Sequence, residues 1–407
     1  MRFVPRATVF SGRNIKDKYL LSEGRLFGLK PCGDGLVPAF GISLLTMNNI
    51  PSSVQAVYLT SAGNLYVYSG GSVYRSTGAY GNFYLYGSGF SNRPFFAECH
   101  EDGEYFTIIC DGVKSVIAKV NSAGTDDCPP VSYGVVHYTR MFGIDSSDAR
   151  VMRWSAPGDV HDWSESINGA GHVRLDSARG DIIKLMAYDN KLIAVREYGF
   201  TVLRAFGEAE SFRADVTDTS TDEIVGDTVA FCSGRLYFFT ATGLYSYDGD
   251  VEKCAVKGLE GFTDAVCAAA CGGYYYVGGK LDGEDAIACI DVKEGEVCFI
   301  KAKATVMCGG ARVFFYGDGL YEITPAENSV GEWESGPLDF GTPQNKYLKS
   351  VSVYGADTLT VSCGERVRTY ADVNGEVNVD MPGREFRFSA SSSEKLRMLC
   401  ARYVIRG

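Results

Sequence analysis

Histidine and tryptophan are scarce in this chain of 407 residues, which has four of the first and three of the second. It also lacks a GxSxG elbow, a phosphate-cradling Gly-Lys-Ser/Thr run and an HExxH pair, which argues against the hydrolase, nucleotide-binding and zinc-protease classes that carry them. His161, beside Asp159 and Asp162, could serve acid–base work or hold a metal, although a solvated turn histidine is the simpler interpretation. We therefore expect no catalytic residue, no cofactor and no metal site.

Calcium-loop and glycosidase signatures are also missing. The acidic runs Asp145–Asp148 and Asp215–Asp222 do not match a twelve-residue calcium loop with its glycine and terminal glutamate. The repeated Ser-x-Asp-x-Gly-x-x-Trp boxes of sialidase-type proteins do not occur. Carboxylate pairs for glycoside hydrolysis stay open, because such pairs meet in space from distant loops.

The first residues lack the apolar core of a signal peptide, and no stretch approaches the length of a membrane span. The 13 cysteines are an odd number, without a CxxC pair or a Cys/His cluster at zinc spacing; Cys267 and Cys271 come closest. Most cysteines stand in apolar strand contexts, where a reduced thiol acts as a small hydrophobe. We predict reduced thiols and synthesis in a reducing compartment.

The charge balance favours acid, with a formal net charge of −11. This argues against a general nucleic-acid binder, although a local basic patch can exist within an acidic total. Forty-eight glycines, 25 tyrosines and 23 phenylalanines are typical of many short strands joined by tight turns. We expect an all-β protein with few helices.

A hairpin unit recurs along the chain: an apolar strand, a glycine turn and a strand of the form Leu-Tyr-x-Tyr. Examples are Leu65–Tyr68, Arg235–Phe239 and Gly243–Gly249. The inner strands return roughly every 36 to 50 residues, the period of four-stranded propeller blades. The pattern predicts a β-propeller of seven blades, with six or eight as alternatives; two ordinary β-sandwiches are the competing architecture.

The composition changes after Thr324-Pro325, where an acidic, turn-rich segment leads into strictly alternating strands such as Lys349–Tyr354. We predict three parts. Residues 1–50 form an N-terminal segment that closes or flanks the propeller, residues 51–328 form the propeller, and residues 329–407 form a small antiparallel β-sandwich.

The run from Arg150 to Trp163 is the least generic part of the sequence. A short strand ends on Trp154, and Ser155 to Asp159 turn the chain, with Pro157 fixing its own φ and Gly158 able to supply a positive one. We predict a structural loop that two indoles hold together, formed by Arg153, Trp154, Pro157, Gly158, Asp159 and Trp163. Arg153 and the two tryptophans could alternatively form a sugar-stacking platform.

This loop, following Arg140–Gly143, resembles the "R-V-x-W-S-x-x-G-D-x-x-x-W" pattern in structural proteins of tailed bacteriophages. The run Glu334–Gly341 resembles phage tail components too. The family is that of propeller-containing tail hub, nozzle or packaged-DNA stabilisation proteins, and the resemblance covers about residues 50–340. It implies a non-enzymatic virion protein, made in the bacterial host cytoplasm and assembled as a ring, six-fold in our expectation, around the DNA exit channel.

The same resemblance implies that the partners are copies of this chain and other tail or connector proteins, with at most non-specific proximity to DNA. An acidic lumen would repel DNA phosphates and let the genome slide. Two other functions remain as alternatives. One is a carbohydrate-directed receptor-binding or glycosidase propeller; the other is a propeller that acts as an interaction hub.

Overall fold

The computed structural model describes residues 6–10, 24–46, 49–76, 82–101, 103–119, 123–125, 129–166, 169–176, 178–188, 190–215, 220–325 and 329–405. Within these ranges the regular elements are β-strands, apart from two short 3₁₀ turns, η2 (Ala209–Ser211) and η3 (Gly226–Thr228). The predicted all-β class is confirmed.

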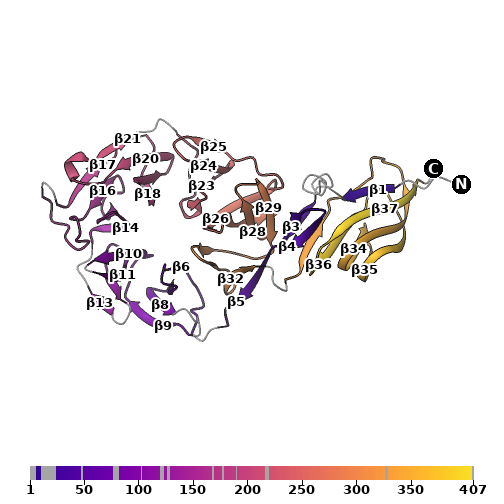
Figure 1. The fold of residues 1–407 in the computed structure, drawn as a ribbon, viewed down its shortest axis with the longest axis horizontal. Helices are drawn as coiled ribbons and strands as arrows, with labels where there is room; N and C mark the ends of the chain where they lie inside the picture. Colours follow the sequence, from indigo (N-terminus) through magenta and orange to yellow (C-terminus); the bar gives the residue numbers. More distant parts are fainter. Residues whose placement is uncertain are drawn as a thin grey trace.

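Six separate four-stranded sheets follow one another around a common axis (Figure 1). Neighbouring strands within each sheet are antiparallel. Five of the sheets consist of consecutive strands: β6 (Ala56–Leu59), β7 (Leu65–Ser69), β8 (Ser72–Ser76) and β9 (Tyr84–Ser88); β10 (Phe95–Glu101), β11 (Glu104–Cys110), β12 (Ser115–Lys119) and β13 (Ala123–Thr125); β14 (Val131–His137), β15 (Arg140–Asp145), β16 (Val151–Trp154) and β17 (Gly171–Arg174); β18 (Ile182–Tyr188), β19 (Lys191–Arg196), β20 (Gly199–Arg204) and β21 (Arg213–Asp215); β22 (Ala230–Cys232), β23 (Arg235–Thr240), β24 (Gly243–Tyr247) and β25 (Val251–Lys253).

The second strand of each sheet is apolar along almost its whole length, because both of its faces are covered by neighbouring sheets. All six residues of β15 are buried, and β23 is buried from Leu236 to Thr240. Separate apolar cores fill the spaces between successive sheets. This radial packing explains why the repeated hairpin could be recognised in the sequence.

The sixth separate sheet closes the ring with a strand from the beginning of the chain. It consists of β30 (Val306–Cys308), β31 (Val313–Tyr316), β32 (Leu320–Pro325) and β5 (Phe40–Leu44). In the register of β5 on β32, Ile323 lies opposite Ile42. Residues of β30 and β6 share one apolar core, so the last and first sheets of the ring pack together.

Four further strands form a meander that is continuous with the C-terminal strands: β26 (Phe262–Cys271), β27 (Tyr274–Leu281), β28 (Glu284–Asp291) and β29 (Glu296–Ile300). The link is β2 (Arg25–Phe27), which pairs in parallel with β29 and antiparallel with β33 (Gly331–Glu334). The result is one eleven-stranded sheet. The predicted seven blades are therefore not shown: six sheets stand alone, and this meander belongs to a larger one.

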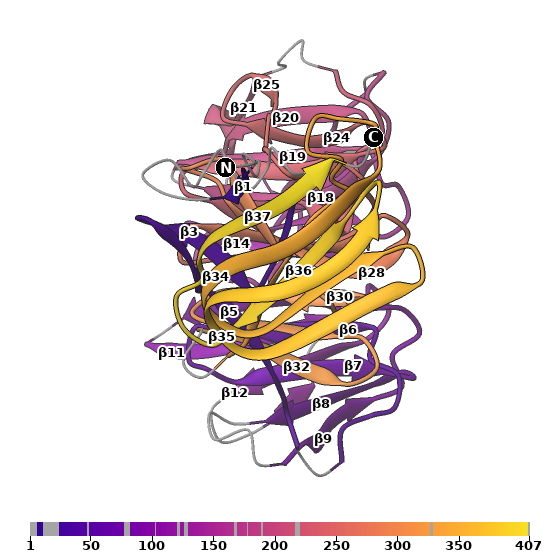
Figure 2. The same cartoon turned by 90° about the vertical axis from the view of Figure 1, so that its right-hand side faces the viewer.

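The C-terminal part of that sheet is built on two strands of 18 residues, β34 (Lys346–Cys363) and β35 (Arg366–Gly383). The first half of β34 pairs with β37 (Arg397–Ile405) and its second half with β36 (Arg387–Ser392). The pairing of β34 with β35 shifts register between Val353 and Ala356. β1 (Arg6–Phe10) follows β37 at the sheet edge. The predicted sandwich is thus shown in part, as a large sheet that changes partners along β34 (Figure 2).

A short hairpin of β3 (Leu29–Cys32) and β4 (Gly35–Pro38) lies between β2 and β5 in the chain. Residues before position 51 therefore contribute strands both to the ring and to the large sheet. The predicted boundary at residue 328 falls on positions outside the described residues.

Candidate functional site

The loop from Arg150 to Trp163 begins in the third sheet of the ring, where β16 pairs with β15 and β17. Ala156 to Asp159 form a tight turn in which Gly158 has a φ of +74°, as the sequence predicts. The Gly158 amide donates to the carbonyl of Thr139 (2.7 Å), which fixes the turn against the preceding hairpin. Asp159 then accepts from the amides of His161 and Asp162.

Trp154 is 9% exposed and points into the core between the third and fourth sheets. Its ring lies 5.3 Å from that of Phe212 and 6.3 Å from that of Phe142, measured between centroids. Within the described residues its indole Nε1 has no hydrogen-bond partner. Because the ring is buried, Trp154 does not form part of an exposed sugar platform.

Trp163 packs elsewhere, so the two indoles do not hold the loop together through contact with each other. It lies against the core between the second and third sheets, which contains Phe95 and Phe106. Its Nε1 donates to the carbonyl of Val160 at 3.0 Å. The strand and the turn place the two indoles in different interfaces, so the loop ties the third sheet to both of its neighbours.

The neighbouring sheet contributes a second tie to this loop. Glu101, at the end of β10, accepts a hydrogen bond from the Val160 amide at 2.6 Å. The same carboxylate lies 3.7 Å from His161 Nε2, and the His161 ring stacks on Phe106. His161 therefore packs between sheets, with one carboxylate beside it.

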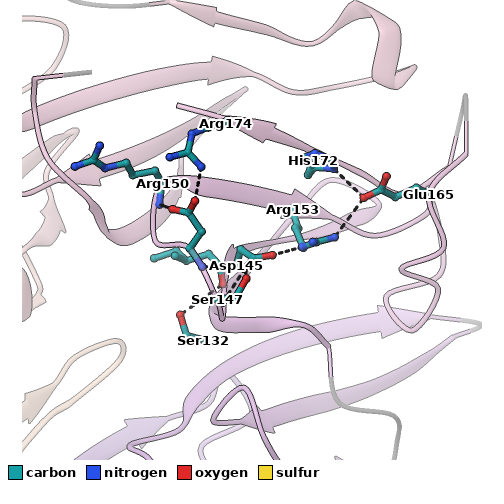
Figure 3. A network of polar contacts seen from close by, with 10 residues as sticks. Ser132, Asp145, Ser147, Arg150, Arg153, Glu165, His172 and Arg174 are labelled. Atoms are coloured by element: carbon teal, nitrogen blue, oxygen red, sulfur yellow. Dashed lines mark hydrogen bonds and ion pairs between the residues drawn. The ribbon is translucent and has the colours of Figure 1, made fainter. Parts of the chain in front are cut away.

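Arg153 organises a polar network on the third sheet (Figure 3). Its guanidinium pairs with Asp145 and lies 3.3 Å from Glu165, which also contacts His172 at 2.8 Å. The Asp145 side chain, 5% exposed, further accepts from the amide and hydroxyl of Ser147. Burial alone would raise the pKa of Asp145, but the Ser147 hydrogen bonds and the Arg153 charge lower it to about 2.

Two further ion pairs extend this network. Arg174 on β17 pairs with Asp148, and Arg150 pairs with Asp181 (2.9 Å), which precedes β18 of the next sheet. The carboxylates of Asp145 and Asp148, considered above as a calcium run, are thus engaged by arginines. Among the described residues no group of three His, Cys, Asp or Glu side chains could hold a metal. The run at 215–222 lies partly outside those residues.

Sequence reasoning missed Arg140, which is buried at the start of β15. It donates to the carbonyls of Ser155 (2.8 Å) and Gly169 (2.7 Å), and it lies over the Phe212 ring. Ser155 in turn accepts from the Met141 amide through its hydroxyl. The sequence signal that could have identified Arg140 is its place as a charged residue directly before an apolar strand. A buried arginine in such a place needs hydrogen-bond acceptors like these carbonyls.

Two sizeable cavities lie outside this loop. One, of about 760 Å³, lies where the ring meets the C-terminal strands and is lined by Arg25, Phe27, Lys301 and Tyr321 among others. The other, of about 450 Å³, lies among the innermost strands of the ring and includes Tyr58, Arg93, Lys184 and Asp227. Neither cavity has a local sequence signal, because the residues that line it are far apart in the chain.

Two further structural findings concern the cysteines and the helices. Every cysteine that the structure describes is a free thiol. Within the described ranges, no helix is long and apolar enough to cross a bilayer.

No protein-family model and no curated protein sequence matches the chain. Similar solved structures include the β-propeller domain of Cps50 (Swd1) from Myceliophteria thermophila, with a TM-score of 0.49 and 11% identity over 69% of this chain and 99% of that one. The ring of four-stranded sheets in this chain is a β-propeller by its own sheet arrangement (Figure 1). Virginiamycin B lyase from Staphylococcus aureus is similar with a TM-score of 0.45 and 11% sequence identity over 70% of this chain and 99% of the lyase.

PorZ, a surface component of the type-IX secretion system of Porphyromonas gingivalis, is similar over 92% of this chain and 63% of PorZ, with a TM-score of 0.46 and 9% identity. At such low identities the likeness concerns the fold alone. None of these three is a phage tail protein by its name, and the resemblance to tail hubs stays a prediction.

Proposed function

We propose that this chain is a non-enzymatic structural protein of a tailed bacteriophage particle, a hub or nozzle component that assembles with copies of itself around the DNA exit channel. In this proposal the protein is made in the bacterial cytoplasm and carried in the virion tail. Its partners are copies of the chain and neighbouring tail or connector proteins. The phage assignment depends on the sequence resemblance of the Arg150–Trp163 loop.

The observation that carries a scaffold role is the continuous sheet from β26 to β1. Strand β2 joins β29 to β33, so the backbone hydrogen bonds run without interruption from the ring to the C-terminal strands. Trp333 on β33 is fully buried at this junction. A particle component that transmits load between neighbours benefits from such a rigid connection. We further propose that β26–β29 acts as the seventh blade.

The assembly surface that we propose is the free edge of β35, which pairs only with β34 in the described part of the chain. From residue 372 onward β35 contains three residues at positive φ, Asp372, Gly375 and Asp380, and the pairing with β34 shifts register there. Such irregularities protect edges from pairing with another chain. Residues 366–371 pair regularly with 358–363, so this stretch presents a regular strand edge.

Mass photometry of the purified chain at increasing concentration tests this assembly. Wild type should form a closed oligomer of fixed size. Val367→Glu places a charge on the free edge, where Val367 is 59% exposed, and should shift the population to monomers. The matched control is Val113→Glu, at a 67% exposed valine in a turn of the second sheet, and it should assemble like wild type. Wild type that stays monomeric under virion-like conditions would refute the proposal.

A carbohydrate-directed function has one observation in its favour. Aromatic side chains are exposed at hairpin tips on neighbouring sheets of the ring, including Tyr105, Tyr138 and Phe206. Aromatic faces of this kind can stack on sugars. Glycan-array binding that disappears in Tyr138→Ala, or hydrolysis that one carboxylate substitution abolishes, would favour this function over the structural one.

A further inference from the structure

The cavity on the axis of the ring brings together side chains from five different parts of the chain. Tyr58 lies on β6, Arg93 precedes β10, Tyr133 lies on β14, Lys184 lies on β18 and Asp227 lies in η3. The volume of about 450 Å³ is enough for a small organic ligand. The loop of Arg150–Trp163 contributes no residue to it.

The charged groups of this cavity leave one positive charge uncompensated. Arg93 and Asp227 form an ion pair at 2.5 Å, joining segments 134 residues apart. Lys184 has no carboxylate partner among the described residues: its Nζ donates to the carbonyl of Val229 at 2.7 Å. An ammonium group carries three donor hydrogens, so two of them are available to a ligand.

Two phenol groups add further donors. The Tyr58 ring stacks on Phe96 at 4.9 Å between centroids, and the Tyr133 ring lies 6.1 Å from that of Phe95. Neither hydroxyl makes a hydrogen bond to another described residue. Burial, reinforced by the nearby Asp227 charge, raises the pKa of Tyr133 to about 12. Tyr133 therefore stays protonated at neutral pH and can donate.

We infer that the axial cavity binds a small anion through a carboxylate or phosphate group, with the Lys184 ammonium and the Tyr58 and Tyr133 hydroxyls as donors and Arg93 at its edge. A cation fits poorly, because the one carboxylate present is already paired with Arg93. A purely apolar ligand would leave the buried donors unsatisfied. The inference is independent of the proposed assembly role.

The protonation of Lys184 makes binding depend on pH. Burial lowers the pKa of Lys184 to about 8, Asp227 raises it and Arg93 lowers it. The other titratable groups facing this region are Tyr58, Tyr133 and Cys267 on β26, whose pKa values burial raises. Since all three stay neutral near pH 8, loss of the Lys184 proton is the change that weakens anion binding as the pH rises above 8.

Isothermal titration calorimetry with inorganic phosphate and, separately, with succinate tests the inference. At pH 7 we expect saturable binding of at least one probe, and the stronger probe identifies the preferred anion. Lys184→Gln should weaken binding about tenfold or more, and Tyr133→Phe, which removes one hydroxyl, about three- to tenfold. The matched controls are Lys280→Gln and Tyr105→Phe, at exposed positions outside the cavity, and both should bind like wild type.

A second titration series from pH 7 to pH 9 should show the affinity falling for wild type but not for Lys184→Gln. If Lys184→Gln fails to fold, the Tyr133→Phe result decides. The inference is overturned if neither probe binds saturably, or if Tyr133→Phe binds as tightly as wild type.

Discussion

Replacing Trp154 with alanine tests whether the Arg150–Trp163 loop acts as a structural tie. A large aromatic side chain buries about 150–250 Å², which at about 25 cal/mol per Å² corresponds to about 4–6 kcal/mol of transfer free energy. Alanine retains a small part of this, and buried tryptophans replaced by alanine typically cost about 3–5 kcal/mol. We expect the free energy of unfolding to fall by about 4 kcal/mol.

The same magnitude predicts the change in melting temperature. An unfolding entropy of about 2.1 cal/mol/K per residue, over the 407 residues, gives a fall of roughly 5 °C for about 4 kcal/mol. Trp154→Phe keeps an aromatic ring and removes the unpaired indole N–H; it should cost about 1–2 kcal/mol. Tyr105→Ala, at a 71% exposed side chain, should cost less than about 0.5 kcal/mol.

Circular dichroism in the far ultraviolet is the appropriate measurement, because tryptophan fluorescence would lose one of its own reporters in the variant. Urea titrations and thermal melts should give the same order: wild type and Tyr105→Ala, then Trp154→Phe, then Trp154→Ala. A Trp154→Ala protein that melts within about 1 °C of wild type would refute the packing described here and reopen the sugar-platform interpretation.

Three further perturbations test other parts of the structure. The pKa of Asp145 is about 2 in the folded chain against 3.8 normally, so its carboxylate contributes about 2 kcal/mol to the free energy of unfolding above pH 4, and this contribution is lost as the pH falls through 2. In urea titrations at a series of pH values, Asp145→Asn should lose less stability than wild type between pH 4 and pH 2. An equal loss in both proteins would contradict the network. Lys346→Met should lower the free energy of unfolding, measured by urea titration, by about 3 kcal/mol, because the fully buried Nζ donates to the carbonyls of Thr342, Gln344 and Arg384. Lys280→Met should change the free energy of unfolding by less than about 0.5 kcal/mol. Gly158→Ala should lower the free energy of unfolding by about 1 kcal/mol because of the positive φ at this position. Gly124→Ala should leave it nearly unchanged, because the added Cβ would make only an ordinary contact of 3.9 Å with Ile117. Equal stability of the two variants would contradict the turn geometry.

The blade strands could be predicted because each combines alternation or a continuous apolar run with a glycine turn. Leu65–Ser69 and Arg235–Thr240 are observed as β7 and β23. The closure of the ring could not be predicted in detail. Strand β5 pairs with β32 across about 280 residues of sequence, and such a long-range pairing leaves no local pattern. The same reason explains why the fusion through β2 was not foreseen and why the blade number was predicted as seven with six or eight as alternatives.

In the Arg150–Trp163 loop, too, only the local geometry could be predicted from the sequence. The positive φ of Gly158 follows from local turn chemistry, but the positions of the two indoles depend on which interface each side chain enters. Trp154 enters the core shared with Phe212, whereas Trp163 enters the core shared with Phe106. The axial cavity is the extreme case, because its Arg93–Asp227 pair joins opposite parts of the ring. Sequence spacing alone carries no information about that contact.

The most direct test of the proposed function is cryo-electron microscopy of the phage particles in which the proposal places this chain. We predict a closed ring of this chain in the tail, with the β35 edge at the subunit contact and the ring surrounding the DNA channel. Particles that lack the chain, or that contain it only as isolated copies away from the channel, would contradict the proposal.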